Sequence, residues 1–169
     1  MNTLNTNKSK LLTSFDFPKL LKYVAVPLLV GLIAALLTRN SMTAFNTFDK
    51  PPLSPPAWLF PVVWTVLYTL MGVSAYLIVS ANASPIDKAK ALAIYTYQLA
   101  VNFLWSIFFF NFEWYLFSFI WIILLWILII LMIKQFFGIS RLAAYLNIPY
   151  LLWVTFAAYL NFGIWILNR

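Results

Sequence analysis

The sequence predicts an all-α integral membrane protein, built as a single bundle of five transmembrane helices. Two observations lead to this prediction. The chain is 64% hydrophobic and only 9% charged, whereas a soluble domain is roughly a quarter charged. It also contains five apolar runs, each long enough to cross a bilayer, which takes about 20 residues. Backbone groups in lipid must bond within their own segment, so these runs are expected to be helices.

The five runs are separated by breaks that contain turn-forming residues. Residues 1–18 are polar and are expected to be a disordered tail, and 19–169 form the membrane domain. Pro61 falls in the first turn of its helix, where its missing N–H costs little. Pro27 and Pro149 lie deeper and are expected to kink their helices. The expected spans are 19–37, 57–80, 86–110, 114–137 and 142–167, with a long proline-rich loop at 38–56.

Basic residues fall mostly on one side of the predicted bundle. The positive-inside rule places the side with more lysine and arginine in the cytoplasm, so we expect a cytoplasmic N-terminus and a C-terminus on the opposite side. The net charge of +7 is then a topology signal, and nucleic acid is not an expected partner. One side holds Lys8, Lys10, Lys19, Lys22, Lys88, Lys90, Lys134 and Arg141, and the other holds Arg39, Lys50 and Arg169.

The composition also argues against several kinds of chemistry. The chain has no cysteine and no histidine, and only four acidic residues. It therefore has no disulfide and lacks the usual soft and borderline metal ligands. Haem iron would find no usual axial ligand, so free-base porphyrin suits the chain better than haem. Glu113 stands alone in a loop, and no general acid–base pair is visible. We expect no metal site and no required cofactor.

Aromatic and amide side chains are predicted to meet at one depth of the bundle. At a rise of about 1.5 Å per residue, Trp64, Asn102 and Trp153 can all lie in the half of the bundle that faces the long loop. Small residues such as Gly72 and Ala157 are expected to open space beside large aromatic ones, which predicts a flat slot with a few hydrogen-bond donors in its walls. Helical spacing puts Tyr68 and Gly72 on the face of Trp64, Gln98 and Trp105 on that of Asn102, and Pro149, Ala157 and Asn161 on that of Trp153.

A purely structural interpretation of the same residues remains open. Tryptophan is common where a membrane helix meets the headgroups, and we assign Trp58, Trp114 and Trp165 to such a belt. Buried amides such as Gln98 and Asn102 can equally serve to hold helices together.

Three stretches of the chain resemble the translocator protein family, also called the tryptophan-rich sensory protein or peripheral benzodiazepine receptor family. The resemblance spans residues 24–168 and includes the five-helix layout. It implies binding of tetrapyrroles, notably protoporphyrin IX, and of benzodiazepine-site lipophilic ligands. It also implies a homodimer in the membrane lipid. The stretches are KPPLSPPAWLFPVVWTVLYTLMG from Lys50, YTYQLAVNFLWS from Tyr95 and RLAAYLNIPYLLWVTFAAYLN from Arg141.

The resemblance also implies roles for particular residues. The proline-rich loop that begins at Pro51 would cover the pocket, stiffened by its prolines. Some bacterial members promote light-dependent breakdown of protoporphyrin, which would make Trp64 and Trp153 redox-active neighbours of the excited macrocycle. Arg39 and Lys50 are candidate partners for the porphyrin propionates, although each can equally be a solvated loop charge. The expected ligand-binding residues are Trp64, Tyr68, Gln98, Asn102, Trp105, Trp153, Ala157 and Pro51.

The chain departs from the family pattern at several places. Leu53 stands where members often have tryptophan, and Ala44-Phe45 replaces an aromatic pair in the first loop. The cholesterol motif of mitochondrial members has a tyrosine and a basic residue where this chain has Phe162 and Ile166. We therefore expect weak sterol recognition through that motif, which belongs to a weak class of pattern in any case.

Three functions are compatible with these observations. The first is a tetrapyrrole-binding sensor or scavenger, with or without light-dependent turnover. The second is a transporter of porphyrins or of other lipophilic molecules such as sterols. Transport ranks lower because no internal repeat or set of coupling charges is visible. The third is a structural bundle that only dimerises.

Overall fold

The protein is a bundle of membrane-length helices. The computed structural model describes residues 15–41 and 48–169, and every element assigned there is helical. Five spans are long and apolar enough to cross a membrane, which confirms the predicted fold class. The predictions for residues 1–14 of the tail and for Ala44-Phe45 lie outside the described residues. The elements are α1 (Phe17–Thr38), α3 (Leu59–Ser80), α4 (Pro85–Ser106) with η1 (Ile107–Asn111), α5 (Tyr115–Phe137), α6 (Arg141–Tyr145) and α7 (Ile148–Leu167).

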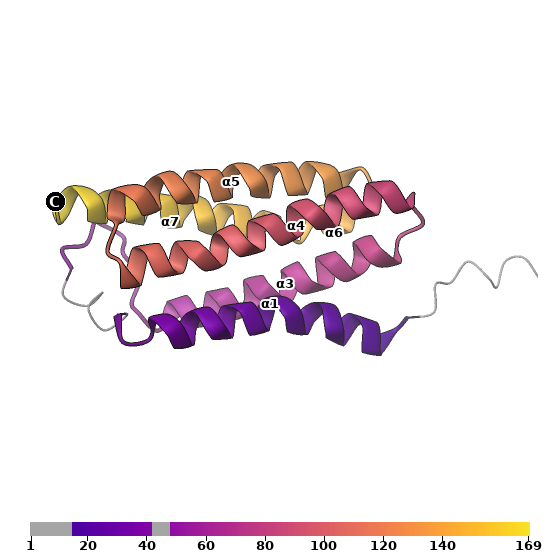
Figure 1. Cartoon of the computed structure of the whole chain (residues 1–169), viewed down its shortest axis with the longest axis horizontal. Helices are drawn as coiled ribbons and strands as arrows, with labels where there is room; N and C mark the ends of the chain where they lie inside the picture. The colour runs from indigo at the N-terminus through magenta and orange to yellow at the C-terminus, as the bar shows by residue number, and fades with distance from the viewer. Residues whose placement is uncertain (1–14, 42–47) are drawn as a thin grey trace, which may run out of the picture.

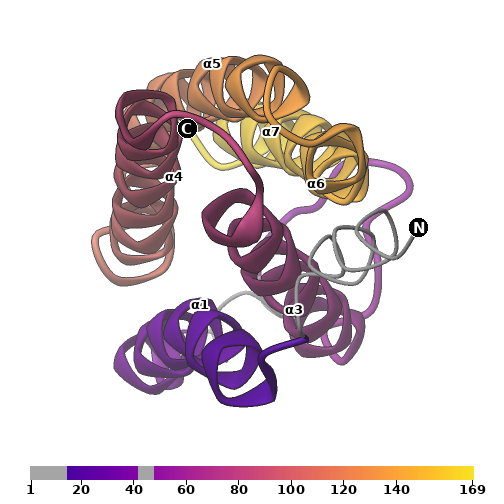
Figure 2. The ribbon, with the colours of Figure 1, turned by 90° about the vertical axis from the view of Figure 1, so that its right-hand side faces the viewer.

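The helices run side by side along the long axis of the molecule (Figure 1). Helix α1 begins at the end of the bundle opposite to the C-terminus, as an odd number of spans requires. The closest helix pairs are α1 with α3, α4 with α5, and α5 with α7, as the end-on view shows (Figure 2). Helix α3 reaches the α6–α7 segment mainly through α6.

Capping residues define where two of the helices begin. The side chain of Asp16 accepts a hydrogen bond from the backbone N–H of Lys19 at 3.0 Å, so α1 begins at Phe17, two residues before the expected start. Ser84 accepts from the N–H of Asp87 at 3.1 Å at the start of α4. Such caps satisfy N–H groups that the first helical turn leaves without a partner.

The fifth span is broken, and the expectation that Pro149 kinks a continuous helix is wrong. Helix α6 ends at Tyr145, and Pro149 lies in the first turn of α7. The amide of Asn147 donates to the backbone oxygen of Ala143 at 2.9 Å and to Ser74 Oγ at 2.6 Å. Because asparagine competes for backbone acceptors and proline favours a helix start, the two residues together end one helix and begin the next. Helix α1, in contrast, continues through Pro27.

The third span ends in a π-helical turn, which the sequence analysis missed. The backbone N–H of Phe112 bonds to the oxygen of Ile107 at 3.2 Å, five residues back. A π turn holds more residues than an α turn, so it changes which residues face inward. Phe109 is buried and stacks on Trp105 at 5.3 Å, while its neighbour Phe110 also faces the interior. Two consecutive phenylalanines thereby contribute to the same side of the helix.

Gly72 does not open space for a ligand, contrary to expectation. A Cβ atom at this position would collide with the backbone of Val24 in α1. The glycine therefore lets α1 and α3 approach closely, as small residues do between membrane helices.

Candidate functional site

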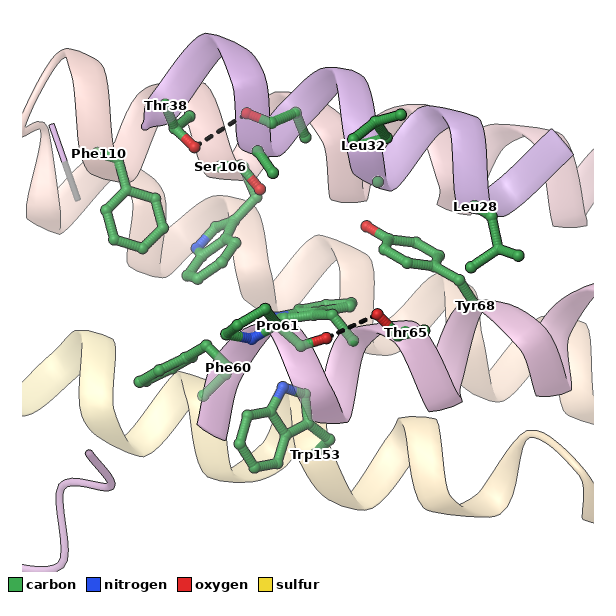
Figure 3. A pocket seen from close by; sticks show the side chains of 16 residues that line it. Leu28, Leu32, Thr38, Phe60, Pro61, Thr65, Tyr68, Ser106, Phe110 and Trp153 are labelled. Atoms are coloured by element: carbon green, nitrogen blue, oxygen red, sulfur yellow. Dashed lines mark hydrogen bonds between the residues drawn. The ribbon is translucent and has the colours of Figure 1, made fainter. Parts of the chain in front are cut away.

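A cavity of about 440 Å³, called the interior cavity below, lies between α1, α3, α4 and α7 and is partly open, because Leu32, Pro61 and Thr65 in its lining are exposed. This volume is within the usual range of small-molecule sites, about 300 to 1,000 Å³. Figure 3 shows side chains from several helices converging on the space between α1 and α3. The lining residues are Leu28, Gly31, Leu32, Ala34, Ala35, Thr38, Phe60, Pro61, Trp64, Thr65, Tyr68, Trp105, Ser106, Phe110, Trp153 and Ala157.

Aromatic rings from α3 and α7 form one wall of this cavity. Trp64 stacks on Tyr68 with ring centroids 5.3 Å apart and meets Tyr150 edge-on at 6.2 Å. Phe60 meets Trp153 edge-on at 5.9 Å. Each ring restricts its neighbour, so the wall presents fixed apolar faces. Flat apolar ligands bind well to such faces by stacking.

Helix α1 forms the opposite wall, and the sequence analysis did not assign it a role. Tyr68 projects from α3 toward α1 (Figure 3), and a Cβ atom on Gly31 would collide with its ring. Ala34 and Ala35 continue this small-residue side toward Thr38. The sequence did carry a pattern that could have predicted this wall: Gly31, Ala34 and Ala35 are small residues three and four positions apart, and such spacing marks a helix face that another helix can approach closely.

The two predicted amides lie outside the cavity lining and bridge helices. Asn102 Nδ2 donates to the hydroxyl of Tyr68 at 3.3 Å, and the hydroxyl of Tyr150 donates to Gln98 Oε1 at 2.9 Å. Both amides are fully buried. Asn102 thus fixes the Tyr68 ring, and Gln98 fixes the Tyr150 ring against Trp64. These contacts fit the purely structural interpretation, in which buried amides hold helices together. Neither amide reaches the cavity surface.

Several polar atoms in this region have no hydrogen-bond partner among the described residues. They are Tyr95 Oη, Gln98 Nε2, Asn102 Oδ1, Asn147 Oδ1 and Trp153 Nε1, all buried. An unpaired buried polar group costs about 1–3 kcal/mol. The folded bundle therefore carries a free-energy cost from unpaired polar atoms next to the cavity.

Trp105 is held in place by a hydrogen-bond chain. Its Nε1 donates to Asn161 Oδ1 at 3.1 Å, and Asn161 Nδ2 donates to the backbone oxygen of Tyr115 at 2.8 Å. Asn161 shares one face of α7 with Ala157, as expected, and both are buried. The chain links α4, α5 and α7 at the edge of the cavity.

The described part of the first loop is fastened to the end of α7. Asp49 exchanges two backbone hydrogen bonds with the side-chain amide of Asn168, at 3.2 and 2.9 Å. The hydroxyl of Tyr159 donates to the oxygen of Pro52 at 2.9 Å. Pro51 is buried against Gly163, where an added Cβ would come within 2.6 Å of the proline ring. Pro51 therefore anchors the loop and does not line the cavity.

The described residues bring no full charge to the cavity surface. Among those that line it, Tyr68 is the one with an ionisable side chain. Arg39 is exposed and directly follows Thr38, which does line the cavity. This position leaves Arg39 near one end of the cavity, outside its apolar part.

The structure brings most of the predicted residues to one place. Trp64, Tyr68, Trp105, Trp153 and Ala157 line the cavity, whereas Gln98, Asn102 and Pro51 support it from outside. The contribution of α1 and of Phe60, Pro61, Thr65, Ser106 and Phe110 was missed. Pro61 had been noted only as a helix-start residue.

The fold and the cavity define a class: a five-span integral membrane protein with an apolar, aromatic-walled cavity for a small molecule. Sequence comparison makes this assignment specific. The TspO/MBR family matches residues 23–166, so the chain belongs to this family.

Relatives from three kinds of organism cover most of the chain. A tryptophan-rich protein TspO of Archaeoglobus fulgidus is 38% identical over 151 residues, 89% of this chain and 97% of its own. One of Chlorobaculum tepidum is 36% identical over 73% of this chain and 78% of its own. The translocator protein of Bos taurus is 30% identical over 85% of this chain and 86% of its own.

Proposed function

We propose that this protein binds a tetrapyrrole of the protoporphyrin IX type in the interior cavity and serves as a porphyrin sensor or scavenger. The observation that supports this most is the aromatic wall, with Trp64, Tyr68 and Trp153 facing one apolar space. The family resemblance supplies the ligand class. No bound cofactor is required for this function.

The affinity would come mainly from burial of the macrocycle. Apolar area removed from water contributes roughly 25 cal/mol per Å² before ordering costs, and offset or edge contacts with Trp64 and Trp153 add to it. The propionates need donors at the edge of the cavity. Arg39 is the candidate that the fold places next to the lining, beside Thr38. Benzodiazepine-site lipophilic ligands would use the same walls without the propionate contacts.

Light-dependent breakdown of the bound porphyrin is part of the proposal. The proposed electron donors to the excited macrocycle are Trp64 and Trp153, two of the three tryptophans that line the cavity. The experiment is to follow the absorbance of protoporphyrin IX with purified protein, in light and in darkness, beside the variant Trp64→Phe plus Trp153→Phe. We expect the porphyrin bands to shift on binding, and to decay only with wild-type protein in light.

Two results would change this proposal. A shifted but stable spectrum under illumination in both proteins would remove the photochemical step and leave a binder. An unshifted spectrum with wild-type protein would reject tetrapyrrole binding. A matched control is Trp121→Phe, because Trp121 is held by a hydrogen bond from its Nε1 to the oxygen of Val101 at 2.9 Å and does not line the cavity.

Transport of lipophilic molecules is the second candidate. The relatives of Bos taurus and Homo sapiens carry the name translocator protein, which is the observation that favours it. Flux of porphyrin into sealed vesicles that contain the protein would support transport. Binding without flux would support the sensor or scavenger.

The orientation and assembly in the membrane are also proposals. The excess of basic residues places the start of α1 in the cytoplasm and the first loop on the other side. Much of the large apolar surface of α1 is exposed, including Leu29, Leu32 and Leu36, which suits contact with lipid or with a second copy in a homodimer. Protease protection in vesicles tests the orientation, and cross-linking in the membrane tests the dimer.

A further inference from the structure

A second hollow lies on the outside of the bundle between α3 and α7. This α3–α7 groove has a volume of about 470 Å³. The part of the chain that the structure describes gives this lining no charged or hydrogen-bonding side chain except the indole of Trp153. Both walls belong to membrane-spanning segments, so the groove faces the hydrocarbon of the bilayer. The lining residues are Val62, Val63, Val66, Leu67, Pro149, Leu152, Trp153 and Phe156.

The groove exists because α3 and α7 are not closely packed helices and touch each other only through their side chains. The tight helix pairs of the bundle are α1 with α3 and α5 with α7, while α3 approaches the fifth span mainly at α6. Between α3 and α7 the contact is made by rings, with Phe60 against Trp153 at 5.9 Å and Trp64 against Tyr150 at 6.2 Å. Side-chain rotation can open such a contact without moving a helix.

Trp153 belongs to the lining of both hollows. It faces the interior cavity on one side and the α3–α7 groove on the other. Figure 3 shows its ring beyond α3, close to Phe60, with the indole nitrogen turned toward α3. Among the described residues, Trp153 is therefore the one residue that the linings of the cavity and of the groove share.

The indole of Trp153 lacks the hydrogen bond that fixes other tryptophans of the bundle. Trp105, Trp121 and Trp126 donate to Asn161 Oδ1, the oxygen of Val101 and Thr155 Oγ1 at 3.1, 2.9 and 2.9 Å. Trp153 Nε1 is buried and has no acceptor among the described residues. Rotation of this ring breaks no hydrogen bond, and an acceptor on a passing ligand would relieve an unpaired donor.

We propose that the α3–α7 groove is a second binding site, for apolar small molecules dissolved in the bilayer, and the route by which they reach the interior cavity past Trp153. The occupant is a lipophilic molecule with at least one hydrogen-bond acceptor. Its apolar part lies in the groove, and its acceptor pairs with Trp153 Nε1 as the ring turns. The inference rests on the proposed function only in that the cavity takes a lipophilic ligand.

The test uses the full chain in phosphatidylcholine vesicles and a probe that is not a tetrapyrrole. The probe is a long-chain alkyl ketone with a diazirine at the end of its chain. Short light flashes at increasing times after mixing, followed by peptide mass spectrometry, locate the adducts. With wild-type protein we expect adducts on Leu152 or Phe156 in the groove first, and on Phe110 or Leu28 in the cavity later.

Val66→Trp fills the groove without touching the interior cavity, since Val66 is 54% exposed and lines only the groove. We expect the rate of cavity labelling to fall about tenfold, within the range by which association rates vary among variants of one site. The final level at long times should match wild type. Val26→Trp is the matched control, because Val26 is 46% exposed on α1 and lines neither hollow.

Cavity labelling of Val66→Trp at the wild-type rate would overturn the route. Cavity adducts in wild type without groove adducts would do the same. Val62→Trp, at the neighbouring exposed position of the groove, repeats the test if Val66→Trp fails to fold by circular dichroism. Because the probe is a ketone, failure of porphyrin to bind would reject the proposed function and leave this result standing.

Discussion

Single residues in this bundle differ in how completely their polar groups are paired. Tyr95 and Tyr150 are both buried tyrosines of the interior. Tyr150 donates its hydroxyl proton to Gln98 Oε1 at 2.9 Å, whereas the hydroxyl of Tyr95 has no partner among the described residues. A buried tyrosine hydroxyl therefore stabilises the fold at Tyr150 and destabilises it at Tyr95.

Replacement of each tyrosine by phenylalanine should separate these two cases. Tyr150→Phe leaves Gln98 Oε1 unpaired, and we expect the free energy of unfolding to fall by about 1–2 kcal/mol. Tyr95→Phe removes a hydroxyl that has no partner among the described residues, so the free energy of unfolding should stay the same or rise slightly. The measurement is unfolding by sodium dodecyl sulfate in mixed micelles, followed by circular dichroism. Equal losses for the two variants would contradict the pairing described here.

At the scale of helices, close approach depends on where a side chain is absent. Gly72 lies against the backbone of Val24 where α3 meets α1, and its missing Cβ sets the distance between the two helices. Gly138 ends α5, where a Cβ would have only an ordinary contact of 3.6 Å with the oxygen of Gln135. Its φ of −68° suits any residue.

Alanine substitution at the two glycines should have opposite effects. Alanine favours a helix over glycine by up to about 1 kcal/mol, but at Gly72 the new methyl group meets backbone that cannot rotate away. We expect Gly72→Ala to lower the free energy of unfolding by about 1–3 kcal/mol, as overpacking does. Gly138→Ala should be neutral or slightly stabilising. A stable Gly72→Ala variant with an unchanged α1–α3 distance, measured by spin labels on the two helices, would argue against this packing.

The whole molecule is closed by a contact between segments far apart in the chain. The first loop joins α1 to α3, two of the helices that wall the cavity, and its described part is fastened to α7 by Asn168 and Tyr159. Leu53 lies in this loop with φ of 66°, a left-handed conformation that is costly for a branched side chain. The fastening therefore holds the segment that contains the strained Leu53 and fixes the start of α3 relative to α7.

Loss of the fastening should be visible as faster hydrogen exchange. In Asn168→Ala plus Tyr159→Phe, the hydrogen bonds to Asp49 and Pro52 are lost, and each is worth about 1 kcal/mol. We expect the amide of Asp49 to exchange at least tenfold faster, because local opening becomes easier by that amount. Tyr145→Phe is the control, since Tyr145 lies in α6, near the other end of the bundle (Figure 1). Unchanged exchange would mean that packing, such as that of Pro51 against Gly163 and of Phe48 against Tyr115, is enough to hold the loop.

Much of the architecture was predictable because lipid leaves a chain few options. Apolar length and the need to satisfy backbone groups identified the five spans within a few residues. Helical periodicity placed Trp64 with Tyr68, and Asn102 with Trp105, on shared faces. The break at Asn147 was missed because its cause is a hydrogen bond to Ser74, 73 residues away in the chain.

Sequence by itself determined the fold class, the spans, the family and several of the aromatic residues that face inward, among them Trp64, Tyr68 and Trp153. The fold class, the spans and the inward-facing sides follow from composition and local period, which each segment carries alone, whereas the family follows from the three sequence stretches that resemble it. Tertiary structure decided what each inward residue does. Asn102 and Gln98 bridge helices, α1 supplies a wall through Gly31, and Trp153 lines two hollows with no partner for its indole nitrogen among the described residues. Such roles depend on which atoms of other helices lie within reach, and a single helix does not specify its neighbours.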